Sequence, residues 1–301
     1  MTTDARLAES YRFCGEVARR EARNFYLAFR LLTAERRQAM CALYAFMRHS
    51  DDLADDEAPG VDKAAALAGW RADLDSALES RESTWPGLPA LADSVHKFAI
   101  PPALLHEVIE GVEMDLSPRR FDHFDELVDY CRHVASAVGL CCIHIWGYDS
   151  DGGRAERLAD RCGLALQLTN ILRDVREDAG LGRVYFPRDD MERHGVTDAD
   201  LHADHAGPAL RNLAADYAAR AYACYDEAAG LVPLVEPIGR PVLLTIAGIY
   251  RAVLDEIVRR DYDVLAGRAS IPKRRKIAIA LRSLSSRFRR TEKPRERDLV
   301  S

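Results

Sequence analysis

Apolar residues recur at helical spacing along almost the whole chain, and the alternating patterns typical of strands are hard to find. Met40, Leu43 and Met47, for example, share one helical face. Breakers such as Pro86-Gly87 separate the periodic stretches. The pattern predicts helices over residues 4–28, 35–57, 62–80, 88–98, 102–116, 124–147, 154–180, 208–230, 240–266 and 272–288.

No interval between these helices is long and polar enough to be a linker, so we expect one all-α domain over residues 1–288. With 301 residues, the chain is long enough to bury a substantial core. Residues 289–301 are mostly charged and polar, and we expect a disordered tail there.

The composition is that of an ordinary globular protein, with 48% hydrophobic and 30% charged residues. The net charge of −6 gives no support to binding of nucleic acid. The seven cysteines are scattered without metal-type CxxC spacing, and the first residues do not resemble a leader, which predicts a reduced cytoplasmic protein. The apolar stretches fall short of the ~20 residues that a membrane-spanning helix needs.

The first cluster of acidic residues lies at the end of the helix predicted over 35–57. Asp51 and Asp55 share one helical face, and Asp52 and Asp56 share the next. Like charges at this spacing destabilise a helix, most of all at its C-terminal end, where the helix dipole is negative. A divalent cation would reverse this repulsion. The cluster alone fits a metal site and a solvated helix end equally well.

Side chains with ligand oxygens form a ladder along the helix predicted over 154–180. Asn170, Asp174 and Asp178 follow one another at i, i+4 and i+8, and Gln167 lies about one turn earlier. Apolar residues occupy the neighbouring faces, so we expect this helix to line a cavity. Oxygen ligands without His or Cys suit Mg²⁺, which takes one or two carboxylates together with phosphate oxygens of a substrate.

Two such clusters, facing one another across a helical bundle, would bind a diphosphate through Mg²⁺. Arg48, Arg173 and Arg183 stand close to the clusters in the sequence. Their guanidinium groups match phosphate oxygens in a bidentate fashion. The alternative for these arginines is an intrahelical ion pair, which fits Arg176 and Arg48 in particular.

Motifs over roughly residues 23–276 resemble those of the squalene/phytoene synthase family, the head-to-head prenyltransferases. The most specific are Asn24-Phe25-Tyr26 with Arg30-Leu31-Leu32, Leu43-Tyr44-Ala45-Phe46-Met47-Arg48, and Leu168-Thr169-Asn170-Ile171-Leu172-Arg173-Asp174 with Gly182-Arg183-Val184-Tyr185-Phe186-Pro187; Gly111-Val112-Glu113-Met114-Asp115-Leu116 is a weaker match. The resemblance implies an all-α isoprenoid synthase fold around a central apolar cavity. It also implies Mg²⁺ as cofactor, with Mn²⁺ as an alternative ion.

Matching positions carry the family's roles onto this chain. The implied metal ligands are Asp51, Asp55, Asn170, Asp174 and Asp178. The implied catalytic residues are the same four aspartates and Tyr130, which resembles a tyrosine near the reacting carbons. The expected substrate contacts are Arg23, Asn24, Tyr44, Arg48, Gln167, Asn170, Arg173, Arg183, Tyr250 and Arg268. Many members have Lys-Ser where this chain has Arg23-Asn24, so we expect diphosphate contact there with altered geometry.

The chemistry of such a reaction sets requirements for the cavity. An allylic diphosphate ionises when Mg²⁺ and arginines stabilise the departing diphosphate, and the carbocation must then meet an alkene before water. The wall should therefore be apolar and aromatic. Candidates are Phe25, Tyr26, Phe29, Leu43, Phe46, Val134, Val138, Leu164 and Leu168, although residues of this kind are more often plain core.

The resemblance predicts condensation of two farnesyl diphosphates to presqualene diphosphate or a squalene-type thirty-carbon product. The alternative is a phytoene synthase acting on geranylgeranyl diphosphate, since a sequence does not measure cavity depth. A class I terpene cyclase and a non-catalytic scaffold are further alternatives. The Gly182–Pro187 motif disfavours the cyclase, and the four retained aspartates disfavour the scaffold. A glycine fingerprint for NADPH is missing, which weakens a reductive second step without excluding it.

The long hydrocarbon tails of prenyl diphosphates leave peripheral membrane contact open. The basic run Lys273-Arg274-Arg275-Lys276 would assist such contact, with ordinary solvated charge as the alternative. Nothing in the sequence indicates the oligomeric state.

Overall fold

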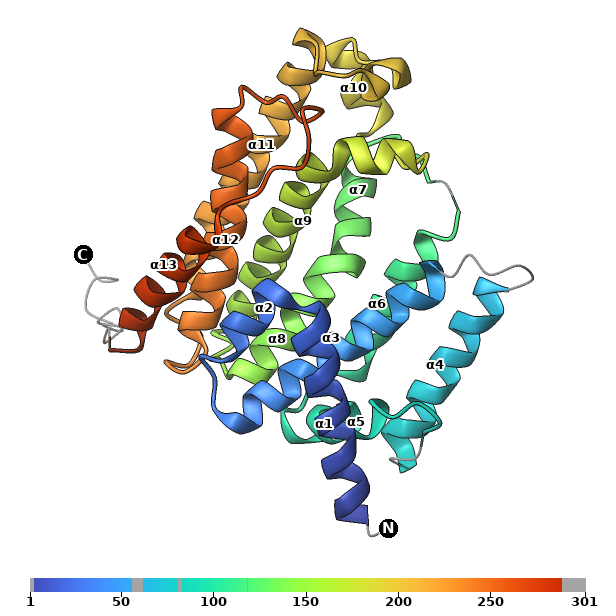
Figure 1. Ribbon diagram of the computed structural model, residues 1–301, viewed down its shortest axis with the longest axis vertical. Coiled ribbons are helices and arrows are strands. Elements are labelled where there is room, and N and C mark those ends of the chain that lie inside the picture. The colour runs from blue at the N-terminus through green and yellow to red at the C-terminus, as the bar shows by residue number, and fades with distance from the viewer. Residues whose placement is uncertain (1–2, 56–61, 81–82, 118, 289–301) are drawn as a thin grey trace.

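The computed structural model describes residues 3–55, 62–80, 83–117 and 119–288, and Figure 1 shows their arrangement. Within these residues the chain forms helices and turns, with one isolated β-bridge between Tyr148 and Val235. The expected tail over 289–301 lies outside the described residues. None of the described helices is both long and apolar enough to span a bilayer. The prediction of an all-α fold is confirmed.

The α-helices are α1 (Thr3–Glu21), α2 (Arg23–Phe29), α3 (Ala34–Asp55), α4 (Lys63–Ser80), α5 (Leu88–Lys97), α6 (Pro102–Met114), α7 (Phe124–Cys131), α8 (Ala137–Trp146), α9 (Arg154–Gly180), α10 (Arg188–His194), α11 (Pro208–Ala228), α12 (Arg240–Arg259) and α13 (Lys273–Ser283). Short turns of other helix types are η1 (Arg132–Ser136), η2 (Asp198–His202), η3 (Ala229–Leu231) and η4 (Leu284–Phe288).

Most predicted helices match, and the differences have local causes. The stretch predicted as one helix over 4–28 is divided at Ala22 into α1 and α2. The helix predicted over 240–266 ends at Arg259, because Asp261 and Tyr262 adopt positive φ angles of 52° and 57°, which no α-helix contains. The short helix α10 was not predicted.

A π-helical turn, η1, interrupts the helix predicted over 124–147 and connects α7 to α8. Glycines allow the neighbouring helices to approach it closely. A Cβ atom on Gly163 of α9 would lie 2.7 Å from Ser136 Cα, and one on Gly111 of α6 would lie 2.9 Å from a Val134 methyl. π-Helical turns inside helices are frequent at functional sites.

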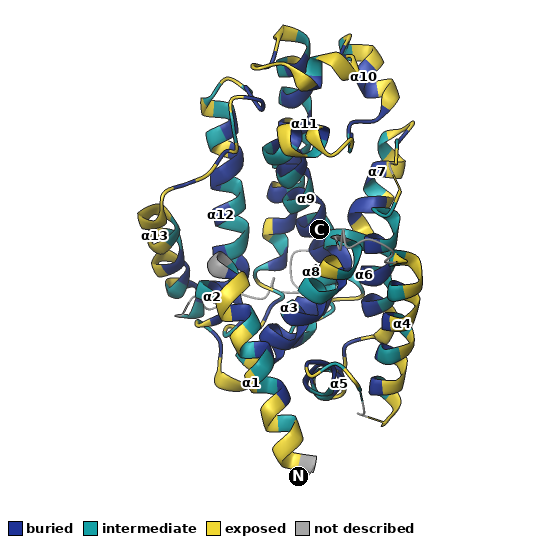
Figure 2. Cartoon of the chain, turned by 45° about the vertical axis from the view of Figure 1, so that its right-hand side comes forward, coloured by how far each residue is buried: buried dark blue, intermediate teal, exposed yellow. Residues whose placement is uncertain are grey.

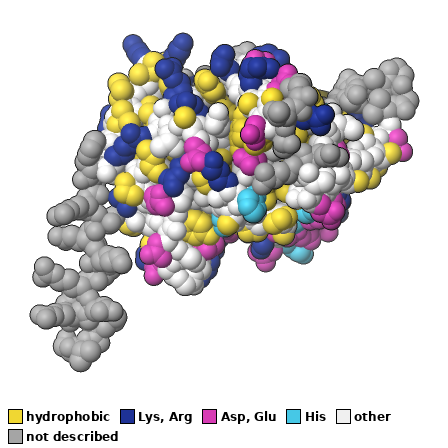
Figure 3. All heavy atoms as spheres, turned by 90° about the horizontal axis from the view of Figure 1, so that it is seen from below, with side chains coloured by type: hydrophobic (Ala, Val, Ile, Leu, Met, Phe, Trp, Pro, Cys, Tyr) yellow, Lys and Arg dark blue, Asp and Glu magenta, His cyan; other side chains and the backbone are white. Residues whose placement is uncertain are grey.

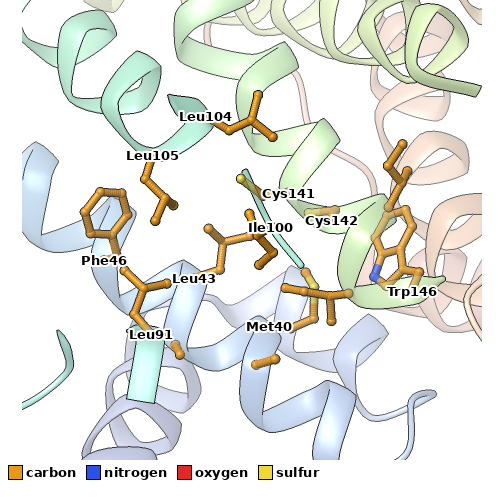
Figure 4. Packing of buried hydrophobic residues seen from close by; sticks show 14 of the residues in the cluster. Met40, Leu43, Phe46, Leu91, Ile100, Leu104, Leu105, Cys141, Cys142 and Trp146 are labelled. Carbon is orange, nitrogen blue, oxygen red and sulfur yellow. The ribbon is translucent and has the colours of Figure 1, made fainter. Parts of the chain in front are cut away.

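Two hydrophobic clusters form the core. The first joins α1, α3, α5, α6 and α8, and Figure 4 shows its centre around Leu43, Phe46, Ile100 and Cys141. The second joins α9, α11 and α12, with fully buried Tyr217 at its centre. Helix α9 packs against α8 on one side and α11 and α12 on the other, and it is buried along most of its length (Figure 2). Leu166 of α9 touches both clusters.

Candidate active site

An apolar cavity of about 200 Å³ lies beside the first cluster, which supplies most of its wall, and reaches the edge of the second at Val134, Leu166 and Tyr250. It is lined by Phe25 and Phe29 of α2, Met40, Leu43, Tyr44 and Met47 of α3, Val134 and Ala135 of η1, Val138, Cys142 and Trp146 of α8, Gln167 and Asn170 of α9, and Ile246 and Tyr250 of α12, among others. Helices far apart in the sequence thus contribute one continuous wall. Such a cavity suits a hydrocarbon chain.

Five of the candidate wall residues line this cavity, and four do not. Phe25, Phe29, Leu43, Val134 and Val138 are in the wall. Phe46 instead stacks on Trp70 in the first cluster, while Leu164 and Leu168 pack into the second. Tyr26 packs against the first cluster outside the wall. Helical spacing alone did not show which apolar face met the cavity and which met a neighbouring helix.

The polar side chains of the wall include Gln167 and Asn170 from the ladder on α9. The Asn170 amide nitrogen donates a hydrogen bond to Gln167 Oε1 at 3.2 Å. The other end of the amide, Asn170 Oδ1, is buried without a hydrogen-bond partner in the described part of the chain. A buried acceptor of this kind is unfavourable unless a ligand satisfies it. The next residue of the ladder, one turn further on, is Asp174.

Asp174 is held by two arginines. Arg173 donates hydrogen bonds to both of its carboxylate oxygens, at 2.8 Å and 2.5 Å, and Arg268 Nε lies 2.9 Å from Oδ1. Arg173 also lies close to the phenol of Tyr250; burial raises the pKa of this phenol, and the charge of Arg173 partly opposes the rise. Three predicted site residues, the adjacent Arg173 and the distant Tyr250 and Arg268, thus gather near the aspartate.

A polar hollow of about 430 Å³ adjoins the apolar cavity. Phe25, Tyr44 and Tyr250 line both, and three cationic side chains, those of Arg173, Arg268 and Lys276, line only the polar one, together with the single anionic side chain of Glu21. An apolar cavity that continues into a cationic hollow matches an amphiphile with an anionic head. Lys276 is a site residue that the sequence interpretation did not include.

Asp178, the last rung of the ladder, has a different environment from Asp174. Burial, followed by the charge of Asp174, raises the pKa of Asp178 to about 7, and Arg183 partly opposes this rise. Asp178 and Arg183 line the same small hollow. A carboxylate whose charge is only partly compensated is the arrangement expected of a site built for a positively charged ligand.

The first acidic cluster ends α3, as predicted. Asp51 and Asp52 are exposed, and Arg48 forms an intrahelical ion pair with Asp52 at 2.5 Å, which is the alternative stated for it. The side chains of Asp55, Arg23 and Asn24 lie outside the described residues. Met47 lines the cavity one turn before Asp51, just as Asn170 does before Asp174. Both acidic clusters therefore begin where their helices leave the cavity wall.

The intrahelical alternative is wrong for Arg176. Its guanidinium instead donates to the backbone carbonyl of Leu265 at 2.7 Å and lies 3.5 Å from Asp204. It thereby ties α9 to the segment that carries Arg268.

Tyr130 belongs to a cluster with Asp115 and Tyr185. Its hydroxyl donates to both oxygens of Asp115, at 3.1 and 3.0 Å, and lies 3.4 Å from the Tyr185 hydroxyl. The two rings stack with centroids 5.3 Å apart. Burial, and then the Asp115 charge, raises the pKa of Tyr130, so the phenol stays protonated. Asp115 and Tyr185 lie in motifs that carried the resemblance, but neither was predicted as a site residue.

The candidate metal ligands beside the cavity are oxygen donors, which is the kind of ligand that Mg²⁺ prefers. Among the described residues, no three His, Cys, Asp or Glu side chains converge closely enough to hold a metal by themselves. The donors that do lie here are oxygen atoms, including the orphaned Asn170 Oδ1. This fits a hard cation that takes few protein ligands and completes its shell with water and phosphate oxygens.

A family model described as squalene/phytoene synthase matches residues 18–275. The chain belongs to the squalene/phytoene synthase family. Among curated relatives it is 37% identical to phytoene synthase 3 of Zea mays over 91% of this chain and 65% of that protein. It is likewise 37% identical to a phytoene synthase of Mycobacterium tuberculosis, over 93% of this chain and 92% of that protein.

Solved structures of the squalene/phytoene synthase family share the fold. A ligand complex of a dehydrosqualene synthase superposes with a TM-score of 0.84 at 28% identity, covering 93% of this chain and 96% of that one. A squalene synthase from Alicyclobacillus acidocaldarius gives a TM-score of 0.78 at 31% identity, covering 85% and 96%. The curated relatives support the phytoene alternative better than the thirty-carbon product that the sequence interpretation favoured.

Proposed function

We propose that the protein joins two geranylgeranyl diphosphates head to head, with phytoene as product. The observation that carries this proposal is the apolar cavity that continues, past Tyr44 and Tyr250, into a hollow lined by Arg173, Arg268 and Lys276. A prenyl diphosphate has the same division into an apolar tail and an anionic head. The names of the curated relatives support the twenty-carbon substrate.

We infer that Asp51, Asp55, Asn170, Asp174 and Asp178 hold Mg²⁺, with Mn²⁺ as an alternative. When bound, this ion supplies positive charge that favours departure of the diphosphate. Arg173 and Arg268 are already oriented around Asp174 and bring further positive charge to the same place. Arg48, Arg183 and Arg23 are proposed substrate contacts for the same reason. Gln167, Tyr44 and Asn24 are proposed to contact the substrate as neutral hydrogen-bonding groups.

The rest of the wall protects the allylic cation. Its aliphatic and aromatic side chains exclude water, which would otherwise capture the cation. The rings of Phe25 and Tyr250 lie 6.0 Å apart between the cavity and the cationic hollow, where their faces would stabilise positive charge. Tyr130, kept as a neutral phenol by burial and then by the charge of Asp115, is the proposed catalytic residue; it lies at the end of α7, just before η1.

The second candidate is a thirty-carbon product from farnesyl diphosphate, which the dehydrosqualene and squalene synthase neighbours favour. Purified protein incubated with Mg²⁺ and either diphosphate, with and without NADPH, separates the two, with products identified by mass spectrometry. We expect phytoene from geranylgeranyl diphosphate without NADPH. Dehydrosqualene or squalene from farnesyl diphosphate alone would favour the second candidate, and no diphosphate release from either would contradict both.

A further inference from the structure

Helix α13 exposes apolar side chains to an unusual degree. Only three large hydrophobic residues of the described chain are exposed: Leu181 at 66%, Ile277 at 41% and Leu281 at 64%. Ile277 and Leu281 lie one turn apart on α13, whereas Leu181 follows the end of α9. Isolated exposed apolar residues are normal, but a pair on one helical face indicates a surface that a membrane or another molecule covers.

Basic residues flank this pair. Helix α13 has the sequence KRRKIAIALRS, with five basic residues and no acidic one. Lys273 precedes Ile277 and Leu281 on the same face, and Arg274, Ala278 and Arg282 form an exposed stripe beside them. The opposite face, with Ala280 and Ser283, is buried. Figure 2 shows the exposed side of α13, and Figure 3 shows Lys and Arg side chains beside hydrophobic ones at this end of the molecule.

The beginning of α13 is not optimised for helix stability. Pro272 precedes it without a side-chain cap, and its first turn has no acidic residue. Lys273, Arg274 and Arg275 instead stand at the positive end of the helix dipole, where cations are unfavourable. Arg275 is partly compensated by Asp255 of α12, at 3.4 Å. Departures from local preference of this kind are expected where function requires them.

We propose that α13 lies flat on an anionic lipid bilayer, with Ile277 and Leu281 in the acyl boundary and Lys273, Arg274 and Arg282 among the lipid phosphates. The two stripes match the two zones of a bilayer surface in both polarity and charge. The chain as a whole carries a net charge of −6, so the attraction is local to this helix.

The position of α13 relates this membrane contact to substrate uptake, an argument that rests on the proposed function. Lys276 of α13, and Ile271 just before it, line the cationic hollow beside Tyr250. A prenyl diphosphate dissolved in a bilayer has its head at the lipid phosphates and its tail among the acyl chains. A protein docked through α13 meets that head beside its cationic hollow, so the substrate need not cross water.

Co-sedimentation of the full chain with vesicles tests the docking without any substrate. The vesicles are of phosphatidylcholine alone or with about one third phosphatidylglycerol. We expect binding only to the anionic vesicles and its loss at high salt. Ile277→Ser with Leu281→Ser should lower the bound fraction at least about fivefold, as should Arg274→Gln with Arg282→Gln. Leu181→Ser, which removes an equally exposed leucine elsewhere, should bind as the wild type does.

The proposal is overturned if the wild type does not bind anionic vesicles, or if the Ile277/Leu281 variant binds as well as the wild type. It is also overturned if this variant abolishes self-association in sedimentation velocity while vesicle binding is absent, because the face would then cover a second copy of the chain. The variant should turn over detergent-dispersed substrate normally and vesicle-embedded substrate slowly. Vesicle binding by an inactive wild type would contradict the proposed function and leave the docking intact.

Discussion

Asp174 and Asp178 lie one turn apart on α9, but the electrostatic environments of their carboxylates differ. Asp174 is paired with Arg173 and Arg268, whereas Asp178 is half-buried, and burial, followed by the charge of Asp174, raises its pKa to about 7. The sequence showed the ladder but not the different environments of its two aspartates, because Arg268, which pairs with Asp174, belongs to a distant segment after α12. Spacing along a helix predicts which side chains share a face and says nothing of the partners that tertiary structure brings.

Asp178→Asn should stabilise the protein in the absence of magnesium. Because the folded chain binds the Asp178 proton more tightly than the unfolded chain does, the wild type is penalised above pH 7 and relieved as the pH falls. We expect the variant to gain about 1 kcal/mol of unfolding free energy at pH 8, a gain that shrinks toward pH 4. Urea unfolding measures this. Asp174→Asn is the control and should lose stability; a less stable Asp178→Asn at pH 8 would contradict the account.

Asp115→Asn should slow turnover while leaving the Michaelis constant nearly unchanged. The carboxylate orients the Tyr130 phenol and has no place among the proposed diphosphate contacts. We expect kcat to fall about tenfold to hundredfold. Asp115→Glu should restore part of it, which a purely structural role would not require. Steady-state kinetics decide, and an unchanged kcat, or a loss confined to the Michaelis constant, would refute the role of Asp115.

At the scale of elements, the helices themselves were predictable and their interruptions were not. Long periodic runs gave α9 its bounds, since apolar residues persist on its faces over its whole length. The π turn η1 left no such signal, because one extra residue per turn hardly changes an apolar pattern. Its packing depends on Gly163 and Gly111, whose meaning becomes visible only when the neighbouring helices are in place.

Gly163→Ala should destabilise the fold by about 1–3 kcal/mol, because its Cβ would lie 2.7 Å from Ser136 Cα and would push α9 away from η1. Gly69→Ala is the matched control. Gly69 also lies within a helix, α4, but a Cβ there has nothing within 4 Å, so alanine should stabilise by about 0.5–1 kcal/mol. Thermal or urea unfolding of both variants tests this pair. Equal changes in unfolding free energy for the two variants would show that the close approach of α9 to η1 does not contribute to stability.

At the scale of the whole molecule, the cavity is formed by helices far apart in the sequence, with most of its wall supplied by the first cluster. The family resemblance implied such a cavity, but only the fold shows that Phe46 packs away from it and Trp146 lines it. The cationic hollow was predicted in part, because the resemblance gave Arg173 and Arg268 as substrate contacts but did not include Lys276. Lys276 belongs to a run of four basic residues with different environments. Lys276 lines the hollow, Arg275 pairs with Asp255 of α12, and Lys273 and Arg274 are exposed to solvent.

Magnesium and inorganic diphosphate should stabilise the protein strongly only when they are added together. No three acidic or histidine side chains of the described residues form a metal site alone, so the ion needs phosphate oxygens to complete its shell. We expect Tm to rise by several degrees with both and to change little with either. Differential scanning fluorimetry, with EDTA as control, measures this. An equal rise with magnesium alone would show a complete protein site instead.

The central claim is that two acidic clusters at the rim of an apolar cavity bring about ionisation of a prenyl diphosphate. The most direct measurement is the rate of diphosphate release from geranylgeranyl and farnesyl diphosphates by the wild type, Asp51→Asn and Asp174→Asn, with circular dichroism to show that helicity persists. We predict release by the wild type and a loss of at least about hundredfold in each variant. Near-normal release by either folded variant would contradict the claim.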